Sequence, residues 1–119
     1  MNREIKFRIW NDYDKKMIYW NELLKNKLAN IFTIPSYDKW LMQYTGLHDK
    51  KGKEIYEGDI IKYRDSRGQH IEKVIFDKGC FYAGMHWGSS TRVAPKLINT
   101  RITEVIGNIY DNPELLGGE

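Results

Sequence analysis

The stretch Leu41–Lys62, LMQYTGLHDKKGKEIYEGDIIK, decides the fold of this 119-residue chain. Leu41, Gln43 and Thr45 alternate with Met42 and Tyr44, the period of two expected of a strand with one dry and one wet face. The segment Asp49–Gly52 follows, where an Asp can accept hydrogen bonds from its own backbone and a Gly can adopt positive φ. It predicts a type I turn closed by a glycine bulge, which reverses the chain.

A second change of direction is predicted at Glu54–Gly58, directly before the β-branched strand that begins with Asp59–Tyr63. The short Tyr-Glu-Gly-Asp step suits a sharp bend between strands, as at the corner of a small barrel. The central stretch therefore predicts strand, tight turn, bend and strand.

Three blocks of the sequence together resemble the YopX family of phage and prophage proteins. They are YTGLHDKKGKEIYEGDII in the centre, VIGNIYDNPELL at Val105–Leu116 and KFRIWNDYDKKMIYW at Lys6–Trp20. The resemblance implies a mostly β fold and a phage-related source, and it brings no established activity and no functional residues to carry over. The positions that match the family motif are Tyr44, Thr45, Gly46, Leu47, Asp49, Gly52, Tyr56, Glu57, Gly58, Asp59, Gly107, Asn108 and Pro113.

The composition indicates one compact domain over residues 1–119, since the length lies in the usual single-domain range of about 100–150 residues. Apolar residues make up 41% and charged residues 29% of the chain, and four Trp, eight Tyr and four Phe supply bulky core material. The lone Cys80 cannot form an internal disulfide. No leader pattern opens the chain and no apolar run approaches the roughly 18 residues that span a bilayer. We therefore expect a protein of the host-cell cytoplasm, with no membrane partner.

The N-terminal segment predicts a hairpin, with strands Glu4–Trp10 and Lys16–Trp20 around a turn at Asn11–Asp14. The alternation typical of strands ends at Asn21–Ala29, where Asn21 could cap a helix of about two turns. The apolar face of that helix would consist of Leu24, Leu28 and Ile31.

The second half of the chain predicts further short strands. Tyr63–Phe76 forms a second hairpin around Asp65–Gly68, and Asp77–Gly79 is a third reversal. It leads into a strand at Cys80–Trp87, and the last strand, Arg101–Tyr110, ends before Pro113. In the Cys80–Trp87 strand we expect a core face of Phe81, Ala83, Met85 and Trp87. The sequence as a whole predicts a mainly β fold, a small antiparallel barrel or sandwich with SH3-like elements, an N-terminal hairpin and at most one short helix.

Motifs that carry catalysis are sparse. The glycines lack the strand-loop-helix setting of a phosphate loop. Glu54, Glu57 and Asp59 could present oxygens to a hard cation in a metal-dependent enzyme. The alternative is that Asp59 caps the backbone of a turn while both glutamates are solvated. Cys80 and His86 lie six residues apart on one predicted strand, about 20 Å at strand rise, too far for a nucleophile and its base. Cys80 then serves as a small apolar filler. We predict no catalytic residue, no metal site and no cofactor.

Basic residues are unevenly distributed. Between Lys78 and Thr103 there are four Lys and Arg and no Asp or Glu, together with aromatic side chains that could stack on bases. A nucleic-acid interface would use Tyr82, His86, Arg92, Lys96 and Arg101. The alternative is an ordinary solvated sheet edge whose charges discourage aggregation.

The leading functional prediction is a small accessory module that binds an unknown phage or host protein and can self-associate. Exposed aromatic residues and open sheet edges support such contacts, whereas a core built from nearly all the aromatics would leave none free. A nucleic-acid-binding module is the second alternative, and a metal-dependent enzyme is the third.

Overall fold

The computed structural model describes residues 4–25, 40–77, 79–84 and 96–116. The chain divides into two compact units, Met1–Tyr44 (unit 1) and Thr45–Glu119 (unit 2), which are described separately below. The single domain over 1–119 stays a prediction. No helix within the described ranges has both the length and the apolar character that a membrane crossing requires.

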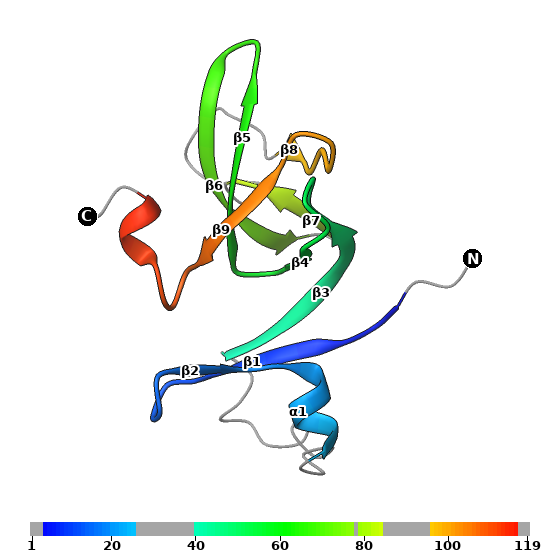
Figure 1. Ribbon diagram of the computed structural model, residues 1–119, viewed down its shortest axis with the longest axis vertical. Coiled ribbons are helices and arrows are strands. Elements are labelled where there is room, and N and C mark those ends of the chain that lie inside the picture. The colour runs from blue at the N-terminus through cyan, green and yellow to red at the C-terminus, as the bar shows by residue number, and fades with distance from the viewer. Residues whose placement is uncertain (1–3, 26–39, 78, 85–95, 117–119) are drawn as a thin grey trace. The chain divides into compact units, whose positions relative to one another are not determined.

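Unit 1 is built on the predicted hairpin (Figure 1, blue). Strand β1 (Phe7–Asn11) pairs with β2 (Lys16–Ile18) and, on its other side, with the start of β3 (Leu41–His48), both antiparallel. The register sets Ile9 opposite both Ile18 and Leu41, so apolar side chains line up across three strands. The core consists of buried Ile9 and Leu23, with Ile18, Trp20, Trp40 and Leu41 packed against them.

The short helix α1 occupies Trp20–Lys25, one residue earlier than predicted. The carbonyl of Tyr19 accepts the first hydrogen bonds, from the N–H groups of Glu22 and Leu23, so Asn21 lies inside the helix and the prediction that it caps it is wrong. The predicted face is wrong too, because Leu23 is buried and Leu24 is 60% exposed. A six-residue helix turns only one residue fully toward the core. The remaining predicted positions, 26–29 and Ile31, lie outside the described residues.

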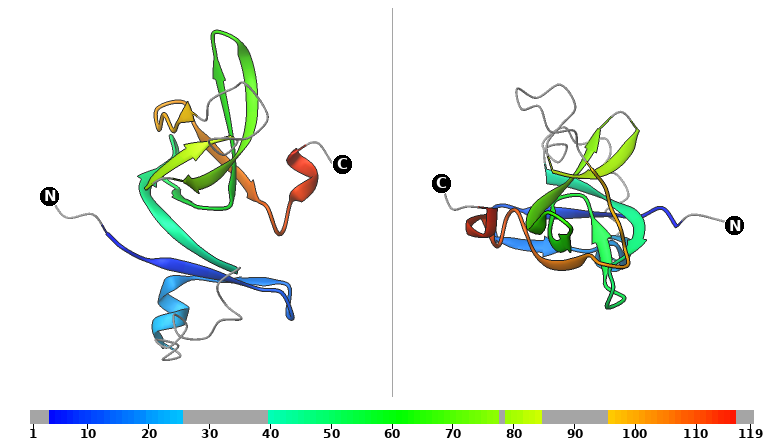
Figure 2. Two further views of the ribbon diagram at one scale, coloured as in Figure 1. Left: turned by 180° about the vertical axis from the view of Figure 1, so that it is seen from behind. Right: turned by 90° about the horizontal axis from the view of Figure 1, so that it is seen from above.

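Unit 2 contains a five-stranded antiparallel sheet that forms a half-barrel (Figure 2). The order is β8 (Lys96–Leu97), β7 (Cys80–Ala83), β6 (Gly68–Asp77), β5 (Asp59–Asp65) and β9 (Glu104–Asn108). The second half of β3 also belongs to this unit, where it pairs with β4 (Glu54–Tyr56). A single-turn 3-10 helix, η3 (Pro113–Leu116), follows β9. The prediction of a mainly β, antiparallel fold with an N-terminal hairpin and at most one short helix is confirmed over the described residues.

The core of unit 2 lies inside the half-barrel. It consists of Ile55, Ile61, Val74, Ala83 and Val105, one from each of five strands. A bulge between Ile60 and Ile61 shifts the register of β5 against β9, and both isoleucines are fully buried. Curling of the sheet around such a bulge explains how consecutive residues are both enclosed.

Three glycine reversals are confirmed, since Gly52, Gly68 and Gly79 have φ of 88°, 118° and 82°. The Gly52 N–H donates to the Asp49 carbonyl, as a type I turn requires. The predicted last strand is too long, because Arg101 lies in a turn and β9 begins at Glu104. The bend predicted at Glu54–Gly58 contains the short strand β4.

The predicted core face of the Cys80–Trp87 strand is partly supported. Ala83 is buried, but Phe81 and its neighbour Tyr82 are both half-buried, so β7 does not alternate cleanly. Cys80 is exposed at the start of β7, and the prediction of an apolar filler is wrong. The other predicted face residues, 85 and 87, lie outside the described ranges.

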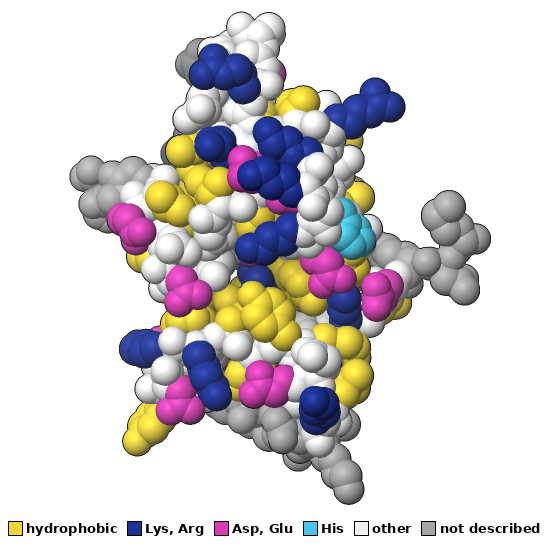
Figure 3. Space-filling model, in the orientation of Figure 1, with side chains coloured by type: hydrophobic (Ala, Val, Ile, Leu, Met, Phe, Trp, Pro, Cys, Tyr) yellow, Lys and Arg dark blue, Asp and Glu magenta, His cyan; other side chains and the backbone are white. Residues whose placement is uncertain are grey.

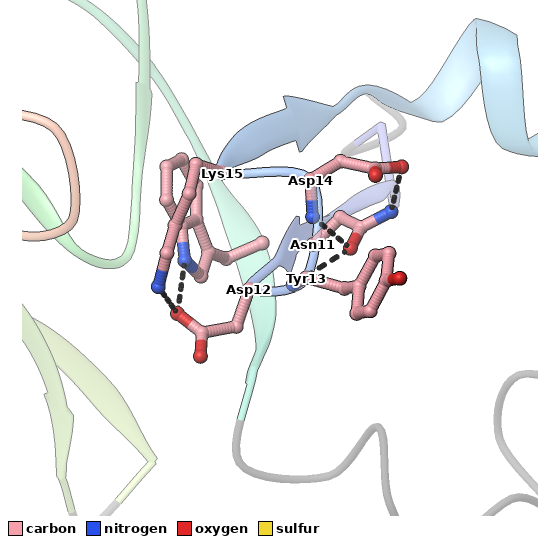
Figure 4. Close-up of polar contacts among 6 residues, drawn as sticks. Asn11, Asp12, Tyr13, Asp14 and Lys15 are labelled. Carbon is pink, nitrogen blue, oxygen red and sulfur yellow. Dashed lines mark hydrogen bonds and ion pairs between the residues drawn. The ribbon is translucent and has the colours of Figure 1, made fainter.

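The same four-residue pattern, Asn-x-Tyr-Asp, ends a strand in each unit. In unit 1, Asn11 Oδ1 accepts hydrogen bonds from the Tyr13 and Asp14 N–H groups at 3.1 and 3.0 Å (Figure 4). Its Nδ2 donates to Asp14 Oδ2 at 3.1 Å. Such side-chain caps replace the partners that the backbone loses at the end of a strand.

In unit 2, Asn108 makes the same three contacts. Its Oδ1 accepts from the Tyr110 and Asp111 N–H groups at 3.0 and 2.9 Å, and its Nδ2 donates to Asp111 Oδ2 at 3.0 Å. This turn is locked further, because Asn112 Oδ1 accepts from the Asn108 N–H at 3.2 Å. Pro113 then opens η3 at a position that needs no N–H donor.

Candidate functional site

A basic groove lies on unit 2, with a volume of about 370 Å³. Residues 62–64 of β5 form part of its lining, and residue 69 of β6 lies beside them, opposite Arg64. The remainder comes from the loop after β3 and from the turn before β9. The residues that line the groove are Lys50, Lys62, Tyr63, Arg64, Gln69, Arg101 and Ile102.

Side-chain and backbone hydrogen bonds hold the two loops of the groove together. The Lys50 N–H donates to the Thr103 carbonyl at 2.9 Å. Asp49 is 6% exposed, and its Oδ2 accepts from the Val105 N–H at 2.9 Å while its Oδ1 accepts from Lys51 and Lys53 N–H groups, both at 2.9 Å. One buried carboxylate thus ties the Lys50 loop to β9 and fixes one wall of the groove.

The pKa of Asp49 reflects this cage. Burial by itself raises its pKa, but hydrogen bonds from the backbone N–H groups of Val105, Lys53 and Lys51, with the charge of Lys53, outweigh burial and lower it. Asp49 is therefore ionised at neutral pH, which strengthens each of its hydrogen bonds.

Positive charge predominates along the groove. Its lining contains four Lys and Arg and no Asp or Glu. Beside it, Glu104 Oε2 contacts Lys51 Nζ at 2.8 Å, which lowers the pKa of Glu104, and the charges of Lys62 and Lys50 lower it further. The same hydrogen bond raises the pKa of Lys51. Lys51 is the main partner of Glu104, and the charges of Lys62 and Lys50 also act on this carboxylate. Figure 3 shows several Lys and Arg side chains close together over the half-barrel.

An apolar pocket adjoins the basic groove and shares Tyr63 and Ile102 with it. Its volume is about 170 Å³, below the roughly 300–1,000 Å³ of sites for drug-sized ligands. Polar groups stand among the apolar side chains of the lining. The pocket is lined by Ile61, Tyr63, Asp65, Ala83, Leu97, Ile98, Asn99, Ile102 and Thr103.

Tyr63, between the two hollows, is held in place by its neighbours. Its ring stacks on the ring of His70, with centroids 4.9 Å apart and an interplanar angle of 27°. His70 Nε2 in turn lies 2.8 Å from Asp65 Oδ1. Burial raises the pKa of the Tyr63 hydroxyl, and the charges of Glu72 and Asp65 add to the rise. The phenol therefore keeps its proton at neutral pH.

Five residues are predicted for a nucleic-acid interface, and the side chains of two of them, Tyr82 and Arg101, are described. Of these two, Arg101 lines the groove. Tyr82 is half-buried on β7, opposite Leu97 of β8, and only the backbone of Lys96 is described. His86 and Arg92 lie outside the described residues. The sequence prediction does not include Lys50, Lys62 and Arg64, because they lie outside the basic segment 78–103 on which it is based. The alternation Lys62-Tyr63-Arg64 on a predicted strand was the available signal.

The three carboxylates of the predicted metal cluster differ in burial. Asp59 is 3% exposed, and its Oδ2 accepts from the Tyr56 N–H at 2.8 Å, which is the turn cap that the sequence suggests. Glu54 and Glu57 are half-buried. Within the described ranges, no group of three or more His, Cys, Asp or Glu side chains is placed to hold a metal ion.

Several residues of the predicted family motif have structural roles. Thr45 Oγ1 donates to the Ile55 carbonyl at 2.7 Å and accepts from the Leu47 N–H at 3.0 Å, which joins β3 to β4. Gly107 leaves room for Asn112, since a Cβ there would lie 2.5 Å from Asn112 Oδ1. The motif therefore specifies bends and caps of unit 2.

Comparison with known proteins agrees with this fold. The crystal structure of protein EF1440 from Enterococcus faecalis superimposes with a TM-score of 0.61, at 23% identity, over 97% of this chain and 99% of that one. At this identity the likeness shows the fold alone. No curated protein matches significantly. The family model described as YopX protein matches residues 6–117, and the chain therefore belongs to the YopX family.

Proposed function

We propose that this YopX-family chain is a phage-related accessory protein that acts by binding, and that the basic groove of unit 2 holds the phosphate backbone of a nucleic acid. The observation that carries the proposal is the convergence of Lys50, Lys62, Arg64 and Arg101 on one hollow. Lys and Arg contacts to phosphate are the sequence-independent basis of nucleic-acid binding. A host-cell cytoplasmic location is part of the same proposal.

The charge of unit 2 as a whole supports a local site. Residues 45–119 contain 11 Lys and Arg and 11 Asp and Glu, so the unit has no net excess of positive charge. A general electrostatic attraction to nucleic acid is therefore weak. What favours binding is that four cations and no Asp or Glu line one concave surface.

The affinity for a fluorescein-labelled oligonucleotide, measured by anisotropy from 50 to 200 mM salt, tests the proposal. We expect affinity to fall steeply with salt, and Lys62→Ala and Arg64→Ala each to reduce the slope by about one. Lys25→Ala removes the same charge from an exposed position of α1 and should leave the slope unchanged. Equal slopes in all three variants would refute the groove as the phosphate site.

A second candidate, self-association, is favoured by a different patch. Phe76 and Phe81 are opposite one another on β6 and β7, their ring centroids are 4.8 Å apart, and Phe76 is 41% exposed. Exposed aromatic side chains are common in protein interfaces. Light scattering should then give a mass that rises with protein concentration at both low and high salt, and Phe76→Ser should abolish the rise. A constant monomer mass would refute it.

A further inference from the structure

We infer that the apolar pocket beside the basic groove receives one unstacked base of the bound strand, so that the ligand of unit 2 is single-stranded nucleic acid. This inference rests on the proposed function, because the groove must hold the backbone first. The groove explains binding of the phosphate backbone, and the pocket adds a site for a base. The inference therefore predicts tighter binding of single strands than of duplexes.

The two hollows are neighbours with opposite chemical character. They share Tyr63 and Ile102, but the four cations line only the groove, whereas the pocket is lined mostly by apolar residues, with Asp65, Asn99 and Thr103 among them. A phosphate is attracted to the groove and repelled by Asp65. A ligand that occupies both hollows therefore has an anionic group and a neutral, largely apolar group close together, which is the arrangement of a nucleotide.

The size and shape of the pocket favour a base over a larger group. A volume of about 170 Å³ suits one ring system. Asn99 and Asp65 stand among the apolar lining and can meet the polar edge of a base, whereas Thr103 is fully buried. Tyr63, fixed by its stacking on His70, gives the shared wall a rigid aromatic ring. Aromatic and apolar walls bind bases without strict sequence preference.

A duplex supplies an unstacked base only at an energetic cost. Its bases are stacked and paired, so extruding one carries an unstacking cost that a single strand avoids. The pocket therefore adds affinity for single strands only, whereas the basic groove alone would bind both forms according to phosphate density.

The test compares three fluorescein-labelled probes on the full chain: a hexathymidylate, an abasic hexamer with the same phosphates, and a six-base-pair G·C duplex closed as a hairpin by a polyethylene glycol linker, so that it stays paired. We expect the hexathymidylate to bind about tenfold tighter than the abasic strand, with the same salt slope. Leu97→Ser should reduce hexathymidylate affinity to that of the abasic strand without changing the affinity for the latter. Leu97 is 72% exposed, so this substitution leaves the core intact, which circular dichroism checks.

The outcomes separate the two claims. If base-containing and abasic strands bind equally and both depend on salt, the groove stands and the base pocket is refuted. If the duplex binds as tightly as the single strand, the pocket is also refuted. If neither hexamer nor duplex binds at 50 mM salt, the proposed function fails and the pocket falls with it. Displacement of hexathymidylate by an equal concentration of an acidic peptide with one Phe would assign the two hollows to a protein ligand instead.

Discussion

The two Asn-x-Tyr-Asp turns form the same hydrogen bonds in different surroundings. At the tip of the β1–β2 hairpin, Tyr13 is 95% exposed and the turn residues are open to water. After β9, Tyr110 is half-buried, and Asn112 closes the turn against Gly107. The position before the Asn differs accordingly, since Trp10 precedes Asn11 whereas Gly107 precedes Asn108. Identical local chemistry thus serves an exposed tip in unit 1 and a packed junction in unit 2.

This difference teaches that burial, more than the number of hydrogen bonds, should determine what a turn contributes to stability. A backbone N–H that loses its partner at an exposed tip is hydrated again, whereas the same loss in a buried turn leaves a group without water. The Asp49 cage is the extreme case in unit 2, because a nearly enclosed carboxylate holds three N–H groups.

The largest effect is expected from Asp49→Ala, which should lower the free energy of unfolding by about 2–4 kcal/mol. The substitution leaves the buried Val105 N–H and the N–H groups of Lys51 and Lys53 without their acceptor. Asp49→Asn keeps one carbonyl oxygen for the loop and should cost less. Urea denaturation measures both, and equal costs below about 0.5 kcal/mol would contradict a cage that depends on burial.

The next largest effect is expected from Gly107→Ala, which should lower the free energy of unfolding by about 1–3 kcal/mol because the new methyl group overpacks the turn. The new Cβ would lie 2.5 Å from Asn112 Oδ1 and 3.0 Å from Asn112 Cβ, and Asn112 cannot move away without giving up its bond to Asn108.

A double-variant cycle checks the cause of that loss. Because Asn112→Ala removes the obstructing atoms, the pair Gly107→Ala/Asn112→Ala should cost clearly less than the sum of the single changes. Additive costs would show that the close approach is relieved in some other way. Gly52→Ala is a useful contrast, since a Cβ there meets nothing within 4 Å and the cost comes from its φ of 88° alone.

The stability of unit 2 should also depend on pH through Asp49. Its pKa is lowered in the folded protein, so its contribution is complete above the ordinary aspartate value of about 4 and is lost as the pH falls through the lowered value. The difference in unfolding free energy between the native chain and Asp49→Asn should therefore be constant from pH 5 to 7 and shrink below pH 4. The pKa of Glu104 is also lowered, so Glu104 makes stability depend on pH in the same direction. Its contribution is the same in both chains and drops out of the difference. A difference that grows toward low pH would contradict the cage.

The sequence predicts the reversals well because their causes are local. Asp49 and Gly52 lie within four residues and form the turn by themselves, as do Asp65 and Gly68. Strand β4 is harder to foresee, because three residues carry little periodicity and its place is fixed by Thr45 Oγ1 from another strand. The same holds for α1, where contact with Ile9 in the core selects Leu23 and leaves Leu24 in solvent.

The candidate site is predicted least well from sequence. The groove collects residues from positions 50, 62–64, 69 and 101–102. The pairing of β5 with β6 and β9, together with the hydrogen bonds that tie the Lys50 loop to β9, brings them together. A run of charge in one window cannot reveal such a surface. The sequence predicts Arg101 because it lies in the segment 78–103, which has basic but no acidic residues. Lys62 and Arg64 lie in a stretch that also contains Asp65 and Glu72, so no excess of positive charge marks them.

The smallest and most direct comparison is Asn108→Ala with Asn11→Ala. Each removes the same three hydrogen bonds, so equal hydrogen-bond energies would predict equal costs. We expect about 1–2 kcal/mol for Asn108, whose turn is half-buried, and about 0.5 kcal/mol or less for Asn11. Amide hydrogen exchange gives a local measure in the full chain: the Tyr110 N–H should lose much of its protection in Asn108→Ala, whereas the Tyr13 N–H at the exposed tip has little to lose. Equal changes at both tyrosines would mean that the capping bond itself, and not its surroundings, determines what each turn contributes.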